Sequence, residues 1–76
     1  MLEEYQAQAQ QAIDQFEQAH QILSEMVVHL AEQYPEEERT FRMGKAMEAL
    51  SAADTLAVQA GNRLHAIEWP TEDRPR

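Results

Sequence analysis

Apolar residues recur every seven positions along most of this chain, and this repeat constrains the fold more than any other feature. Such a repeat is typical of an amphipathic helix that packs against another helix. It predicts a first helix over about residues 2–33, roughly 48 Å long at 1.5 Å per residue. The residues at the a and d positions of its heptads are, at a, Leu2, Ala9, Phe16, Leu23 and Leu30, and, at d, Tyr5, Ala12, Ala19 and Met26.

The repeat resumes in a new phase after Tyr34-Pro35. Proline breaks a helix interior but is tolerated in a first helical turn, and the three glutamates after it suit the positive end of a helix dipole. We therefore expect Pro35 to start a second helix, over about residues 35–68, which Trp69-Pro70 ends. One long kinked helix in a larger coiled coil is the alternative. The second repeat has Met43, Leu50, Ala57 and Leu64 at a, and Ala46, Ala53, Ala60 and Ile67 at d.

Two helices joined by a short corner predict an all-α fold, an antiparallel two-helix hairpin over residues 1–69, with a mobile tail over 70–76. A tight turn at Pro35 would pair a positions with d positions across the hairpin. Phe16 would then face Ala53, and Leu23 would face Ala46, so that large residues mostly meet small ones. Gly61 would serve close contact between the helices.

A single hairpin of 76 residues buries little apolar surface, and the chain has no cysteine for a disulfide. We therefore expect it to dimerise into a four-helix bundle or a larger symmetric assembly. Apolar residues at e and g positions widen the stripe beyond one helix contact. The same surface could instead dock a different protein. The expected self-association flank comprises Ile13, His20, Val27, Tyr34 and Met47.

The net charge is −8, from 14 acidic and 6 basic side chains. This balance argues against binding duplex DNA or an anionic membrane, both of which need excess Lys and Arg. No apolar run is long enough to span a bilayer, and the amino terminus lacks the basic-then-apolar order of a signal peptide. A cytoplasmic location is therefore expected. Because the acidic residues are spread around both helices, mimicry of nucleic acid is a minor alternative.

Two polar pairs are candidate sites. Glu17 and His20 have the Glu-x-x-His spacing of carboxylate-bridged metal sites, but other acidic residues point outward in this register, so no metal and no cofactor is expected. Asp54 lies among small residues, at an e position like His20. A hydrogen bond between His20 and Asp54 across subunits would make assembly depend on pH.

Arg39, Arg42 and Lys45 form a basic cluster at the start of the second helix. With the helix dipole they could hold an anion such as phosphate. Ion pairs of Glu36 with Arg39 and of Glu38 with Arg42 are the competing interpretation.

Catalytic residues are not expected. The sequence has no cysteine, no serine placed with a histidine, no glycine-rich phosphate loop and no paired carboxylates on rigid walls. We therefore expect a small acidic, non-enzymatic interaction protein that inhibits or escorts another protein. Its anchors would be Ile22, Val28, Phe41 and Leu56.

In size and composition the chain resembles the accessory proteins that phages and mobile elements encode against host proteins. In addition, "PEEER" followed by "MEALSAAD" resembles phage-encoded cyclic-nucleotide sponges over a short, gapped stretch. This second resemblance implies an alternative function, an oligomer that sequesters a small phosphorylated ligand such as a cyclic nucleotide. The basic cluster would then hold phosphates, while Tyr34 or Phe41 stacks on a base.

Overall fold

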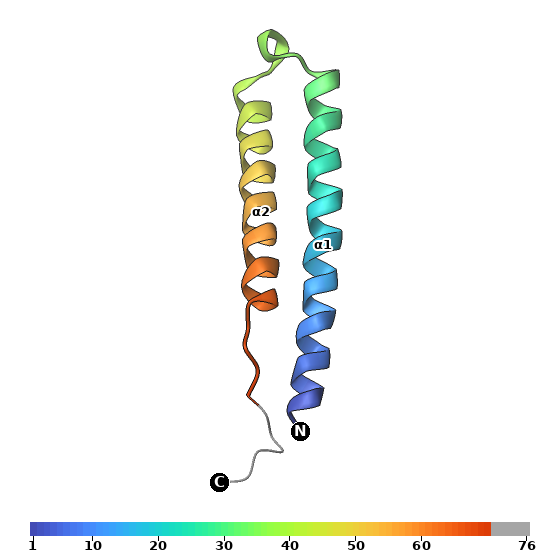
Figure 1. Ribbon diagram of the computed structural model, residues 1–76. Coiled ribbons are helices and arrows are strands. Elements are labelled where there is room, and N and C mark those ends of the chain that lie inside the picture. The colour runs from blue at the N-terminus through green and yellow to red at the C-terminus, as the bar shows by residue number, and fades with distance from the viewer. Residues whose placement is uncertain (71–76) are drawn as a thin grey trace.

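The structure is a computed structural model that describes residues 1–70, and it consists of two antiparallel helices joined by a corner (Figure 1). Helix α1 spans Leu2–Gln33, a single 3₁₀ turn, η1, spans Glu36–Glu38, and helix α2 spans Phe41–His65. The chain is only 15 × 13 Å across. The predicted all-α hairpin is confirmed, and the alternative of one long kinked helix is wrong.

The corner is longer than expected, because Pro35 does not begin α2. Its φ of −57° is compatible with a helix, but its ψ of 156° is extended, and only the η1 turn follows. Helix α2 begins at Phe41, after Thr40, whose Oγ1 accepts a hydrogen bond of 3.1 Å from the backbone N–H of Met43. Thr40 is therefore the N-cap of α2, in the position where a hydroxyl replaces the missing backbone acceptor.

Helix α2 also ends earlier than expected, at His65 rather than near Glu68. Arg63 and His65 lie in its last turn, where cationic side chains suit the negative end of the helix dipole. The backbone N–H of Ala66 still donates to the carbonyl of Asn62, over 3.1 Å, and the chain then continues without helix to Pro70. Apart from Pro70, the tail expected to be mobile lies outside the described residues.

The longer corner changes the register between the helices. Phe16 lies opposite Gly61, where an added Cβ would be 3.8 Å from the Cβ of Phe16. The predicted layer of Phe16 against Ala53 is therefore wrong, and the other predicted layers move with it. Because α2 starts further along the chain, the first turns of α1 extend past the end of α2 (Figure 1).

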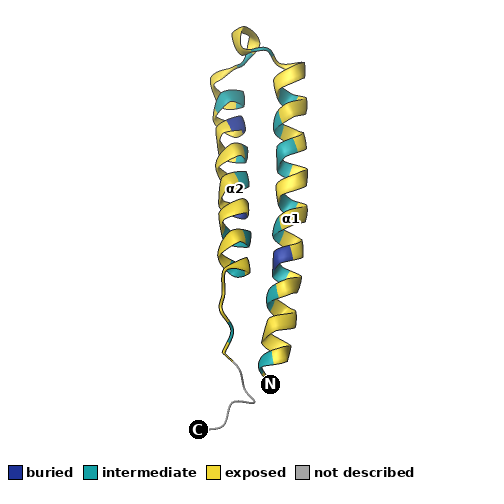
Figure 2. Ribbon diagram, in the orientation of Figure 1, coloured by how far each residue is buried: buried dark blue, intermediate teal, exposed yellow. Residues whose placement is uncertain are grey.

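The seam between the helices uses the a and e positions rather than a and d. Ile13 and Met47, both at e, are only 5% and 8% exposed, whereas Tyr5 and Met26, both at d, are 55% and 42% exposed. Buried and intermediate positions lie on the sides of α1 and α2 that face each other (Figure 2). A stripe through a and e alternates steps of four and three residues, so it is as regular as a stripe through a and d.

Candidate interaction surfaces

The predicted self-association flank is not one free surface. Ile13, Val27 and Met47 contribute to the seam within a single chain, and Ile13 and Met47 are buried there. Tyr34 lies apart from them at the corner, where its carbonyl oxygen accepts a hydrogen bond of 2.8 Å from Nε of Arg39. Ile13, Val27 and Met47 are therefore used within the hairpin itself, whereas Tyr34 is 40% exposed at the corner.

His20 and Asp54 form a polar layer within this seam. Nδ1 of His20 lies 2.5 Å from Oδ1 of Asp54. Both residues occupy e positions, so they take the place of an apolar pair. The contact between these two side chains was expected across subunits, but the structure makes it within one chain. A single polar pair in an apolar seam favours one register over others, since a slip would leave both groups unpaired.

The antiparallel packing gives the hairpin two faces. Both helices contact each other through a and e positions. A rotation of 180° about an axis perpendicular to the plane of the two helices therefore exchanges α1 with α2. Equivalent flanks of the two helices therefore lie on the same side. The side formed by the d and g positions is called the apolar face, and the side formed by the b positions is called the polar face. The large apolar residues and the d-position alanines of this face are Tyr5, Ala12, Ala19, Ile22, Met26, Ala46, Ala53, Leu56 and Ala60, and its remaining d and g positions hold Gln8, Gln15, His29, Gln33, Arg42, Ala49 and Arg63.

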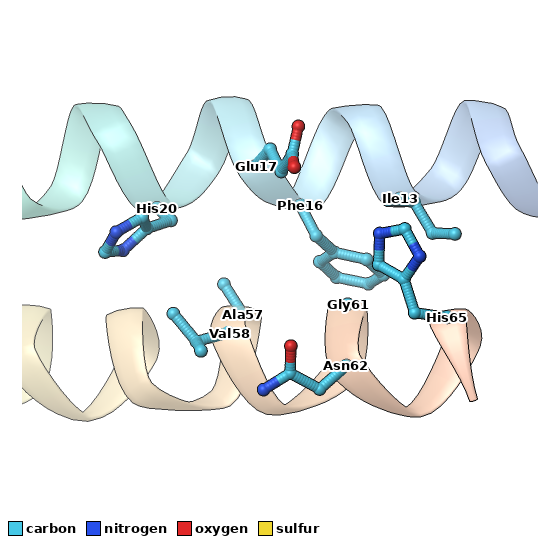
Figure 3. A pocket seen from close by; sticks show the side chains of 9 residues that line it. All are labelled: Ile13, Phe16, Glu17, His20, Ala57, Val58, Gly61, Asn62 and His65. Atoms are coloured by element: carbon cyan, nitrogen blue, oxygen red, sulfur yellow. The ribbon is translucent and has the colours of Figure 1, made fainter.

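On the polar face, near the open end of the hairpin, the helices enclose a shallow hollow of about 170 Å³ (Figure 3). Phe16 projects from α1 toward Gly61 of α2, and His65 lies beside the Phe16 ring. The hollow reflects the missing side chain at Gly61. Its floor is apolar, through Phe16 and Ala57, and its rim is polar, through Glu17, His20, Asn62 and His65.

Glu17 and His20, the pair with metal-site spacing, both lie on this rim. His20 is directed to Asp54 by the contact described above. Among residues 1–70, no group of three or more His, Asp or Glu side chains lies close enough to hold a metal ion. The rim can therefore offer hydrogen bonds to a visiting group, but it does not form a metal centre.

Two residues of the predicted basic cluster, Arg39 and Lys45, contact other groups of the chain. Arg39 is half-buried and donates to the backbone at Tyr34. Lys45 lies with its Nζ 3.7 Å from Oε1 of Glu48 and 5.4 Å from the centre of the Phe41 ring. Arg42 occupies a g position of α2, and Lys45 occupies a c position. Arg39 and Lys45 therefore contact different neighbours, and these contacts do not direct them toward one common anion site.

The residues predicted to anchor a partner are all exposed, but they lie in three places. Ile22 and Leu56, 59% and 64% exposed, belong to the apolar face. Val28 is on the side of α1 that points away from α2, beside Ser24 and His29. Phe41 stands at the start of α2, and it is 79% exposed. The set therefore divides into the apolar face and two outlying anchors, Val28 and Phe41.

The chain exposes more surface than a compact protein of its mass. Its accessible surface is 6321 Å², whereas a compact monomer of 8.8 kDa exposes about 4,800 Å². Within the described range, large hydrophobic side chains that the seam does not cover account for a share of this excess.

Comparison of the chain with protein-family models, with curated proteins and with solved structures found no match. Within residues 1–70, neither helix contains a stretch long and apolar enough to cross a bilayer.

The apolar face is the surface that the sequence interpretation missed. Tyr5, Met26 and the alanines at d were expected in the core of the hairpin, so they were not considered as a contact surface. One signal could have revealed the error. Ile13, Val27 and Met47 at e are larger than the alanines at d, and the larger side chains take the more buried stripe.

Proposed function

We propose that this protein acts without catalysis, as a helical interaction protein that binds another protein and thereby inhibits or escorts it. The observation that carries this proposal is the exposure of large apolar side chains which the hairpin itself leaves uncovered. Exposed apolar surface rimmed by polar residues is typical of protein contact sites.

In this proposal one surface serves self-association and another binds the partner protein. The apolar face runs along both helices and suits self-association into a four-helix bundle, in which each helix contacts two neighbours. Val28 and Phe41 lie outside that face, and they remain available to a different protein after self-association. Phe41 is the stronger anchor, since aromatic residues contribute most to binding at protein interfaces. The Lys45 ammonium lies 5.4 Å from the centre of the Phe41 ring, within the range of a cation–π contact.

Affinity capture from lysate of the source cells tests this function with matched variants. The expected result is a protein retained by the wild type and lost with Phe41→Ala and with Val28→Glu. Ala7→Glu is the control, because Ala7 is exposed on the same side of α1 as Val28 but lies far from the corner. Equal capture by all of these forms would contradict the proposal.

Thermal shift with cyclic di- and trinucleotides tests the alternative of a phosphorylated ligand. A ligand that binds only the folded state raises Tm. A rise that disappears in Arg42→Ala would favour sequestration of such a ligand over protein binding.

A further inference from the structure

We infer that the apolar face is covered by a second copy of this chain, arranged about a two-fold axis parallel to the helices. In this arrangement both corners lie at the same end, and α1 of each copy packs on α2 of the other. The inference rests on the proposed function in one respect, namely that the exposed apolar residues act as contact surfaces. It adds the orientation of the two copies and the residues that meet between them.

The chemistry of the apolar face suits an identical apolar face. The d and g positions of α1 and α2 contain no Asp or Glu, although the chain has 14 acidic residues. The d positions in the middle of the face are alanines, which allow two pairs of helices to approach closely. The larger side chains of Ile22, Met26 and Leu56 stand between and beside them and can fill the remaining space.

The size of the apolar face matches what a stable dimer needs. Helix α2 has 25 residues, so the part of the hairpin with two helices is about 38 Å long. Two helices side by side, 8–10 Å apart, are about 20 Å wide. One whole side of the hairpin therefore has a projected area of about 750 Å², of the same order as the roughly 800 Å² of accessible surface that each partner buries in a specific interface of standard size.

The charges along the outer edges of this face decide the orientation. The c and g positions form these edges. The edge of α1 carries Glu4, Glu25 and Glu32 and no Lys or Arg. The edge of α2 carries Arg42, Lys45 and Arg63 and no acidic residue. These charges are exposed, so they contribute to specificity more than to affinity.

Two arrangements can bring the apolar faces together. A two-fold axis across the helices would place α1 on α1 and α2 on α2, so that like charges would meet along both edges. An axis parallel to the helices places α1 on α2 of the other copy, and the acidic edge meets the basic edge. Complementary edges therefore favour the arrangement with both corners at the same end.

The register of the hairpin then specifies which residues meet. Because Phe16 lies opposite Gly61 and His20 contacts Asp54, Ile22 and Leu56 lie at nearly the same height. Ile22 of one copy therefore contacts Leu56 of the other, and the symmetry repeats this contact. By the same register, Glu32 lies at the height of Arg42 and reaches Arg42 of the other copy near the corner.

Disulfide cross-linking tests this orientation directly, because the chain has no cysteine of its own. Ile22→Cys and Leu56→Cys are purified separately, unfolded together, refolded and oxidised at low concentration. We expect a covalent dimer that joins position 22 to position 56, at several times the yield of either variant oxidised alone. Val28→Cys mixed with Leu56→Cys is the control, and it should give no such dimer, since Val28 lies away from the apolar face.

The opposite outcomes would overturn the inference. Efficient cross-linking of Ile22→Cys to itself, or of Leu56→Cys to itself, would show the other orientation. No cross-linking of any pair, with a mass of one chain, would show that a second copy does not cover this face. The proposed function would survive that result if Phe41→Ala still abolished capture of a protein, and it would fail if capture were unaffected.

Charge exchange at the corner gives a second, independent readout. Glu32→Arg and Arg42→Glu should each weaken the dimer, by about three- to tenfold in its dissociation constant, and the two substitutions in one chain should restore it. If the double variant instead weakened the dimer by the sum of the two single effects, this result would contradict the pairing of Glu32 with Arg42 between copies.

Discussion

Two adjacent valines offer a matched test of which stripe forms the seam. Val27 occupies an e position and is half-buried between the helices, whereas Val28 is 56% exposed on the far side of α1. Replacement by alanine removes two methyl groups in each case, and each buried methyl group contributes about 0.8 kcal/mol. Alanine is also a better helix former than valine by about 0.5 kcal/mol, and this gain is the same at both positions.

The two substitutions are expected to change the free energy of unfolding differently: one destabilises the protein and the other does not. Val27→Ala should lose about 1.5 kcal/mol of burial and regain about 0.5, for a net destabilisation of about 1 kcal/mol. Val28→Ala should be neutral or stabilised by up to about 0.5 kcal/mol. Neither residue belongs to the apolar face, so self-association affects both variants equally when they are compared at one protein concentration.

Urea unfolding followed by circular dichroism at 222 nm measures both free energies of unfolding. The difference between the two variants should be about 1.5 kcal/mol, with unchanged dependence on urea. Equal effects would refute the seam through a and e positions. A larger loss of unfolding free energy in Val28→Ala would mean that the side of α1 that points away from α2 is buried, contrary to the hairpin structure.

Three further experiments test the local account. Gly61→Ala should stabilise the hairpin by about 0.5–1 kcal/mol in thermal unfolding, because the new Cβ would meet that of Phe16 at an ordinary 3.8 Å; destabilisation would mean that the helices are closer there. Thr40→Ala should cost about 1 kcal/mol through loss of the N-cap of α2, and Thr40→Ser should cost much less; equal losses would exclude a capping role. A double-mutant cycle of His20→Ala and Asp54→Ala should give a coupling of about 0.5–1 kcal/mol, since both side chains are partly exposed; zero coupling would show that their contact adds nothing to stability.

The hairpin itself could be predicted from the sequence because it depends on coarse signals. A long heptad repeat, strong helix formers and one proline between two phases suffice to predict two helices and a reversal of the chain. The range of α1 also follows, since nothing interrupts its repeat before Tyr34. These signals are local, and each agrees with the fold.

The register could not be predicted, because it depends on the length of the corner. Pro35 and the glutamates after it are equally compatible with a helix start and with a single 3₁₀ turn before an extended residue. Thr40 carried the better start signal, as a capping residue immediately before the second repeat. Once α2 begins at Phe41, every layer moves, and two of the alanines at d, Ala46 and Ala53, become exposed, while Ala12, Ala19 and Ala60 stay only half-buried.

The choice of stripe was ambiguous for a related physical reason. Each helix of a four-helix bundle has apolar residues at three or more heptad positions, because it contacts two neighbours. The sequence alone does not say which of these positions face the helix of the same chain. In this protein the bulky residues Ile13 and Met47 at e face it, together with Ala57 at a, whereas the alanines at d are half-buried or exposed.

Light-scattering mass on a size-exclusion column tests the central claim most directly, with wild type, Leu56→Glu and Val28→Glu measured over a hundredfold range of concentration. Leu56 and Val28 have similar exposure, but only Leu56 lies on the apolar face. We predict twice the chain mass of 8.8 kDa for wild type and Val28→Glu, and a single chain for Leu56→Glu. A wild type that stays at 8.8 kDa throughout, or a Leu56→Glu variant that stays at twice that mass, would contradict this account.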